Sequence, residues 1–235
     1  MAHIVELFGA PGTGKSSLAR ALDGRRISRR RIIDARRLAR VPRVRLLGRL
    51  VGRDLTPEER RSALAARRED WAELIEVAAE APAALASDPL RALHAPGWLV
   101  TTLELRALAV VAPDDLIVVL DEGLVQRAAI VCGPDPDDER LDRYMRALPA
   151  GDLHVHLRED PEALVARLRA RERIIDRHVG LDDIALRESI TEDAVLLARC
   201  AAALDEAGHR VLATPSGRGT EAMVDAVIEA LGGTK

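Results

Sequence analysis

Short apolar runs alternate along the chain with longer stretches in which apolar residues recur at helical spacing. Residues 116–120 form the strongest run, Leu-Ile-Val-Val-Leu, in which every position is apolar. A continuous run of this kind is typical of a central parallel strand that is covered on both faces. Weaker runs predict further strands at residues 3–8, 31–34, 153–157 and 210–213. We therefore expect about five short strands.

Helices are predicted between these strands by apolar spacing and by capping residues. Residues 16–22 carry Leu and Ala at helical spacing. Thr56, Pro57 and Glu59 form a capping box with proline at the first helical position, which predicts a helix from there to about Ala81. Helices are also expected at residues 98–111, from Asp160 onward, and from a Thr220 cap to just before Gly232.

This alternation of strands and helices predicts the α/β class, with a parallel sheet of about five strands and helices on both faces. We expect a single domain over residues 1–235, with its core at about residues 1–33 and 113–235. Residues 34–112 are expected to form a mostly helical insert, and residues 160–180 to form a lid.

Composition narrows the class of protein. Hydrophobic residues make up 48% of the chain and aromatic residues only 2%, which favours helices over an all-β sandwich. The net charge of −3 gives no reason to expect bulk attraction to nucleic acid. Cys132 and Cys200 are too few for a disulfide scaffold and lack metal-ligand spacing. Neither a signal peptide nor a membrane-length apolar run is found, so we expect a soluble, cytoplasmic protein without a membrane partner.

A glycine-rich segment follows the first predicted strand and meets the spacing G-x-x-x-x-G-K-S in full. We assign its residues, together with the next serine, to phosphate binding: Gly9, Ala10, Pro11, Gly12, Thr13, Gly14, Lys15, Ser16 and Ser17. Glycines allow successive backbone N–H groups to turn inward around a phosphate, and the following helix adds its positive N-terminus. In such a P-loop, Lys15 reaches the β- and γ-phosphates of a nucleoside triphosphate, and the Ser16 hydroxyl binds Mg²⁺.

The choice of lysine at this position strengthens the assignment. Lys15 and Lys235 are the only lysines of the chain, and every other Lys-or-Arg position is arginine. A compact ammonium is suited to entering the loop, whereas a guanidinium is bulkier and planar. A glycine-rich turn without a ligand is the alternative. The sequence therefore predicts ATP and Mg²⁺ as cofactors.

Two carboxylates, Asp121 and Glu122, follow the most apolar strand. Ligands bind at the carboxyl edge of open α/β sheets, so Asp121 is a candidate Mg²⁺ ligand or base and Glu122 a candidate catalytic carboxylate. Capping of the next helix is the alternative for both. Gln126 and Arg127 lie about one helical turn further on. Arg127 is a candidate for binding a substrate phosphate or hydroxyl, with an outward ion pair as the alternative.

Arginines are dense between residues 162 and 177. The positions are Arg167, Arg169, Arg171, Arg173 and Arg177. Guanidinium groups carried by a mobile segment would stabilise the charge on a transferring phosphoryl group and exclude water, so we expect Arg169, Arg171 and Arg173 to act catalytically. A solvated charged helix is the alternative.

The order of these motifs resembles the nucleoside and nucleoside-monophosphate kinases, in particular thymidylate kinase and the deoxynucleoside kinases. The resemblance covers roughly residues 1–25 and 115–231. It implies the P-loop NTPase fold, transfer of phosphate from ATP with Mg²⁺, and a lid matching residues 160–173. It also implies that the loop from Thr214 to Gly217, with Pro215, lies beside adenine. Where thymidylate kinases usually carry Asp-Arg and deoxynucleoside kinases Glu-Arg-Ser, this chain carries Asp121-Glu122-Gly123.

The expected insert should select the phosphate acceptor. Its first part is rich in arginine, from Arg36 to Arg53. An anionic acceptor is the functional interpretation, and a solvated helix face is the alternative. Asp34, at the end of a predicted strand, is either an acceptor-binding carboxylate or a helix cap.

These observations favour a kinase that phosphorylates a small molecule, most of all a nucleoside or a nucleotide-like metabolite. Two alternatives stay open, a polynucleotide or modified-base kinase and a P-loop NTPase that acts as a switch. Nucleic acid is a less favoured partner, and the sequence does not decide whether the chain forms a homodimer.

Overall fold

A computed structural model describes residues 2–40, 42–46, 49–52, 56–80, 89–170, 178–214 and 217–232. Its main sheet has the strand order β2-β3-β6-β1-β7-β8. The strands are β1 (His3–Phe8), β2 (Arg26–Ile27), β3 (Arg30–Asp34), β6 (Leu116–Leu120), β7 (Leu153–Leu157) and β8 (Val211–Thr214). All neighbours in the sheet pair in parallel except β2, which is antiparallel to β3. The predicted α/β class and the five parallel strands are confirmed.

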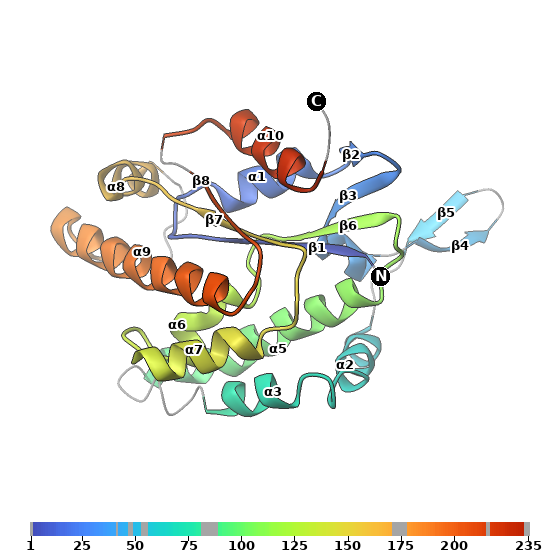
Figure 1. The fold of residues 1–235 in the computed structure, drawn as a ribbon, viewed down its shortest axis with the longest axis horizontal. Coiled ribbons are helices and arrows are strands. Elements are labelled where there is room, and N and C mark those ends of the chain that lie inside the picture. The colour runs from blue at the N-terminus through green and yellow to red at the C-terminus, as the bar shows by residue number, and fades with distance from the viewer. Residues whose placement is uncertain are drawn as a thin grey trace.

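Helices cover both faces of this sheet (Figure 1). One face packs against α1 (Lys15–Leu22) and α10 (Thr220–Ala230), whose side chains join those of Val5 and Leu7. The helices on the other side are α5 (Pro89–Val110), α6 (Ala128–Val131), α7 (Asp138–Ala147) and α9 (Asp183–Glu206). Further out, α2 (Pro57–Ala65) packs on α5, and α3 (Ala72–Ala79) packs on α7.

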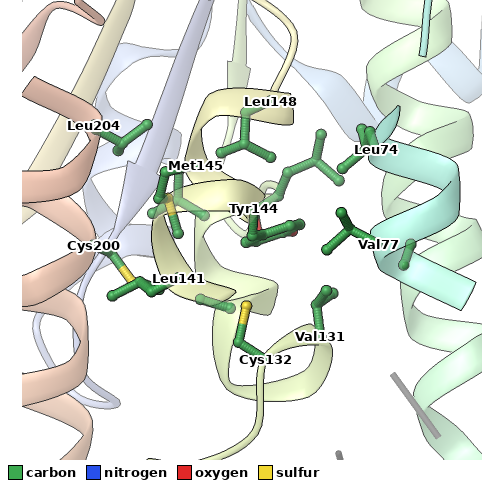
Figure 2. Close-up of a cluster of buried hydrophobic side chains, with 14 of the residues drawn as sticks. Leu74, Val77, Val131, Cys132, Leu141, Tyr144, Met145, Leu148, Cys200 and Leu204 are labelled. Atoms are coloured by element: carbon green, nitrogen blue, oxygen red, sulfur yellow. The ribbon is translucent and has the colours of Figure 1, made fainter. Parts of the chain in front are cut away.

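The largest buried cluster lies between the sheet and this second helical layer. Tyr144 of α7 is fully buried at its centre, surrounded by aliphatic and sulfur-containing side chains (Figure 2). Its hydroxyl donates a 2.7 Å hydrogen bond to the carbonyl of Leu124, so the only tyrosine of the chain is both packed and satisfied. Cys132 and Cys200 lie in the same cluster as buried free thiols.

Three predicted helix boundaries were wrong. The segment 56–81 is divided into α2 and α3, because residues 67–70 are all charged and the turn there brings Trp71 into the core at 6% exposure. The capping box at Thr56 is confirmed. Helix α5 begins at Pro89 rather than at Trp98 and continues through Pro96, with Ala95 and Leu99 buried on either side of the proline. Thr220 is the first residue of α10 and not its cap, since Gly219 precedes the helix without a side-chain bond.

The segment between β3 and β6 is less helical than predicted. It starts with the 3-10 helix η1 (Ala35–Arg40) and continues into a two-stranded antiparallel hairpin of β4 (Pro42–Leu46) and β5 (Arg49–Gly52). Only then do α2, α3 and α5 follow. In Figure 1 the hairpin extends away from the main sheet. In the described part of the chain, no helix combines the length and apolar character needed to cross a membrane.

Candidate functional site

The glycine-rich segment that was predicted to bind phosphate connects β1 to α1 at the carboxyl edge of the sheet. Gly9 begins it, and a Cβ at this position would lie 2.5 Å from the carbonyl oxygen of Leu157 in β7. Only glycine allows the chain to pass this close to the neighbouring strand. Helix α1 starts after Gly14 without a side-chain cap, so its first backbone N–H groups are oriented toward the loop, as an anion site requires.

Lys15 lies inside the loop with 8% of its surface exposed. Its ammonium donates hydrogen bonds to the carbonyls of Gly9, at 2.6 Å, and of Ala10, at 3.2 Å. The Thr13 hydroxyl donates to the Ala10 carbonyl at 2.9 Å. The loop is therefore closed on itself by its own side chains, with the ammonium bound to two of its carbonyls.

Asp121 and Ser16, which lie far apart in the sequence, meet in space. Asp121 directly follows β6 and is 6% exposed, and its Oδ2 accepts a 3.1 Å hydrogen bond from the Ser16 hydroxyl. Arg36 of η1 also donates to both carboxylate oxygens of Asp121, at 3.0 and 2.8 Å. This contact was not predicted, because nothing in a sequence that is rich in arginine shows which arginine will reach Asp121.

A second ion pair lies beside Asp121. Glu122 is half exposed and accepts a 3.4 Å hydrogen bond from Arg127, the last residue of the 3-10 helix η2 (Val125–Arg127). Arg127 also donates to the buried hydroxyl of Thr102 on α5 at 3.0 Å. The structure thus brings Glu122 and Arg127 together at the site, where they pair with each other.

The donor atoms at Ser16 and Asp121 fit a magnesium ion carried by a nucleotide. Magnesium prefers oxygen ligands, keeps several waters, and is bound in kinases through one or two carboxylates plus substrate phosphates. Among the described residues no group of three or more His, Cys, Asp or Glu side chains could hold a metal. The Ser16 hydroxyl and the Asp121 carboxylate supply two oxygen ligands of the kind that magnesium prefers.

Helix α8 (Pro161–Arg169) begins the expected lid and packs directly on the phosphate loop. Leu164 and Leu168 share a buried cluster with Ala10. Arg169, in the last turn of α8, donates to Asp183 at 2.8 Å and to the carbonyl of Leu181 at 2.6 Å, which places its guanidinium against the start of α9. Arg171 and Arg173 lie outside the described residues.

Glu159 joins the start of α8 to the loop after β8. Its side chain is 8% exposed and pairs with Arg167 of α8 at 2.7 Å. The same carboxylate accepts hydrogen bonds from the backbone N–H groups of Asp160, at 3.1 Å, and Gly217, at 3.0 Å. Sequence reasoning did not single out Glu159. Pro215, expected near adenine in the loop that includes Gly217, lies outside the described residues.

Two buried histidines, His154 and His156, lie on β7 beside the site. His156 stacks on Phe8 with ring centroids 4.8 Å apart, and burial lowers its pKa to about 4. His154 is also buried, and burial lowers its pKa to about 3. Both rings are therefore neutral at physiological pH.

Comparison with solved structures finds a similar fold in a deoxyadenosine kinase. A deoxyadenosine kinase from M. mycoides, solved with dCMP and a flexible dCDP bound, matches with a TM-score of 0.53 at 10% identity, covering 97% of this chain and 98% of the kinase. A shikimate kinase from Bacteroides thetaiotaomicron matches with a TM-score of 0.45 at 17% identity, covering 98% of both chains. No protein-family model and no curated protein sequence matches the chain.

The deoxyadenosine kinase match confirms the fold expected from the sequence resemblance. Because the two sequences are only 10% identical, this match shows the fold alone.

Proposed function

We propose that this protein is an ATP- and Mg²⁺-dependent kinase that transfers the γ-phosphate to a small molecule, with a nucleoside or nucleotide-like metabolite as the leading acceptor class. The observation that carries the proposal is the contact between Ser16 and Asp121 beside a complete phosphate loop. A glycine-rich turn without a ligand has no need of a buried carboxylate next to its serine hydroxyl. The fold of a deoxyadenosine kinase supports the same class.

In this proposal the phosphate loop binds the triphosphate through its backbone N–H groups and through the Lys15 ammonium. Lys15 leaves the carbonyls of Gly9 and Ala10 to donate to the β- and γ-phosphates. Ser16 and Asp121 hold the magnesium ion, which neutralises charge on the phosphates when it is bound. The positive end of α1 adds to the same field.

Glu122 and Arg127 act on the acceptor side. The acceptor oxygen forms a bond to the γ-phosphorus as the bond to the β–γ bridging oxygen breaks, and the acceptor hydroxyl loses a proton. Glu122 is the more exposed of the two adjacent carboxylates and is placed to take that proton, while Arg127 orients it. Asp121 is occupied by its own contacts with Ser16 and Arg36.

The remaining parts surround this centre. The segment 34–112 covers the acceptor, and the segment 160–180 serves as the lid over the phosphates. Arg169 would have to leave Asp183 and Leu181 to reach the transferring group, as the arginines of a closing lid do. The transferring phosphoryl group is contacted by Arg171 and Arg173 of the lid, and adenine lies beside Pro215, as expected from the sequence.

The proposal is tested by measuring ADP release from ATP and Mg²⁺ with a panel of acceptors: nucleosides, nucleoside monophosphates, sugars, hydroxylated carboxylic acids, aminoglycosides and DNA ends. We expect one small-molecule class to raise ADP release at least tenfold over the acceptor-free rate, and Lys15→Ala to abolish the increase. Asp121→Asn should retain nucleotide binding and lose turnover.

Two outcomes would overturn this assignment. Stimulation by DNA alone would make the chain a polynucleotide kinase, with the arginines after Asp34 facing the nucleic acid. Hydrolysis that responds to no acceptor would indicate a nucleotide switch.

A further inference from the structure

Glu6 is a charged residue in the interior of the central strand. It is 2% exposed in β1, between Val5 and Leu7, which pack toward α1 and α10. Because successive side chains of a strand point to opposite faces, Glu6 shares the other face with Ile4 and Phe8, which pack in clusters with α5 and α7. Burial of a carboxylate on this apolar face is costly unless its oxygens are bound.

The carboxylate of Glu6 lies against the turn that carries Asp121 and Glu122. Its Oε1 accepts a hydrogen bond from the backbone N–H of Val125, which begins η2. A Cβ on Gly123 would lie 2.2 Å from Cδ of Glu6, so the turn can pass this close only with glycine at that position. The contact with Glu6 thereby explains the glycine at position 123.

A second contact ties the same turn to the phosphate loop. The side-chain oxygen of Gln126 accepts a 3.0 Å hydrogen bond from the backbone N–H of Gly9. The turn is thus held at two neighbouring residues, by Glu6 at Val125 and by Gly9 at Gln126. Together these contacts set where Asp121 stands relative to Ser16.

We propose that Glu6 is a positioning residue, whose ionised carboxylate holds the turn 121–125 so that Asp121 faces Ser16, and whose protonation loosens that turn. The inference rests on the proposed function only in taking Asp121 to serve the nucleotide. Glu6 itself is placed to touch neither nucleotide nor acceptor. It acts through the backbone of the turn.

The groups that face Glu6 decide when its charge changes. Arg106 from α5 and Arg127 from η2 favour the ionised form of Glu6, as does the Val125 N–H. Tyr144 from α7 also interacts electrostatically with Glu6, and His154 lies beside Glu6 in register on β7. Burial outweighs the arginines and the N–H group and raises the pKa of Glu6 from 4.5 to about 7. The ionised form therefore dominates above pH 7 and the neutral form below it, so the turn should be firmer at pH 8 than at pH 6.

The test measures the turn directly, without nucleotide. Hydrogen–deuterium exchange of residues 121–127, corrected for intrinsic rates, is followed at pH 6 and pH 8 in the wild type, in Glu6→Gln, and in Glu229→Gln as a matched exposed control. We expect protection in the wild type to rise roughly tenfold from pH 6 to pH 8, because a charge-assisted hydrogen bond is about twice as strong as a neutral one. Glu229→Gln should behave like the wild type, and Glu6→Gln should show no rise.

Equal pH dependence in the wild type and Glu6→Gln would overturn the inference. Gly123→Ala offers a second variant, since Gly123 is outside the left-handed region and the added methyl group introduces only the clash with Glu6. It should lose protection at both pH values, and unchanged protection would also overturn the inference.

If Glu6→Gln does not fold, the chemical shift of the Val125 amide in the wild type provides the test. This shift should change with pH with a midpoint near 7. A shift that does not change with pH would refute the role of Glu6. None of these readouts uses nucleotide. A failure of ATP binding would therefore count against the proposed function alone.

Discussion

Arg36 pairs with Asp121, the carboxylate proposed to hold a metal ion. Its guanidinium is 62% exposed, whereas the Asp121 side chain is 7% exposed and also accepts from Ser16. An exposed arginine that pairs with a buried carboxylate competes with any cation that needs the same oxygens. Arg37, its neighbour in η1, pairs instead with Asp23.

We predict that Arg36→Gln increases the affinity of the protein for Mn²⁺ in the presence of ADP, measured by electron paramagnetic resonance of the free ion. The expected gain is about two- to fivefold, the size of a partly exposed ion pair. Arg37→Gln is the control and should leave Mn²⁺ affinity unchanged. Weaker binding in Arg36→Gln would show that the arginine supports the metal rather than competing with it.

Glu6 also determines how folding stability depends on pH. Its folded pKa, about 7, lies above the ordinary value of 4.5, so the folded state binds the proton more tightly than the unfolded state does. This contribution is fully present below pH 4.5 and is lost as the pH rises through 7. His154 and His156 act in the opposite direction, because burial lowers their pKa values to about 3 and about 4 and the fold loses stability as the pH falls below 6.5.

Glu6→Gln separates the two effects, since both histidines are retained. We predict that the variant gains free energy of unfolding relative to the wild type on going from pH 5 to pH 8. The gain should be on the order of 2 kcal/mol, because each pKa unit corresponds to about 1.4 kcal/mol. Urea denaturation at the two pH values measures it. A constant difference between variant and wild type would contradict the elevated pKa.

At the scale of elements, α8 and the loop after β8 are joined through one carboxylate. Glu159 pairs with Arg167 and accepts the Gly217 N–H, so the beginning of the lid and the loop expected near adenine are fixed to each other. Glu162, one turn away, is 72% exposed and pairs with Arg187 at 3.4 Å. It lies in the first turn of α8 and serves as the exposed control.

We predict that Glu159→Ala weakens ATP binding about five- to tenfold while inorganic triphosphate binding changes little, because the loop but not the phosphate cradle loses its support. Glu162→Ala should change neither affinity. Isothermal titration calorimetry with ATP and with triphosphate measures both. An equal loss for the two ligands would place the effect of Glu159 on the phosphate loop instead.

The sequence predicts elements well where a local signal specifies them. The apolar run 116–120, the glycine loop after β1 and the capping box at Thr56 all depend on neighbouring residues, and the structure confirms each. Helix α9 was missed although Leu186, Ile190 and Leu197 are spaced for one face, because acidic residues interrupt the pattern. The start of α5 was predicted nine residues late, because the helix continues through Pro96, a residue that usually breaks a helix.

At the scale of the whole molecule, the candidate site is assembled from distant segments at the carboxyl edge of a parallel sheet. The phosphate loop and Asp121 could be predicted, since each follows a recognisable strand and this edge binds ligands in open α/β sheets. The supporting contacts could not. Arg36 reaches Asp121 from η1, and Glu6 reaches Val125 from within β1, and both contacts exist only because β3, β6 and β1 are neighbours.

Glu6 is recognisable in the sequence as a charged residue inside a strand that is otherwise apolar from Ile4 to Phe8. Such an interruption of a buried strand indicates a polar partner but does not identify it. The roles assigned to Glu122, Arg127 and the lid arginines remain predictions for the acceptor assay.

Binding of a nucleoside triphosphate by the loop is the claim on which the kinase assignment depends, and calorimetric titration with a non-hydrolysable ATP analogue and Mg²⁺ tests it most directly. Lys235, the other lysine of the chain, provides the control. We predict saturable binding of the analogue to the wild type and to Lys235→Ala. In Lys15→Ala the affinity should fall roughly 10- to 100-fold, the range expected for losing a hydrogen bond to a charged group. Absence of binding to the wild type, or equal affinity of Lys15→Ala and the wild type, would contradict triphosphate binding by the loop.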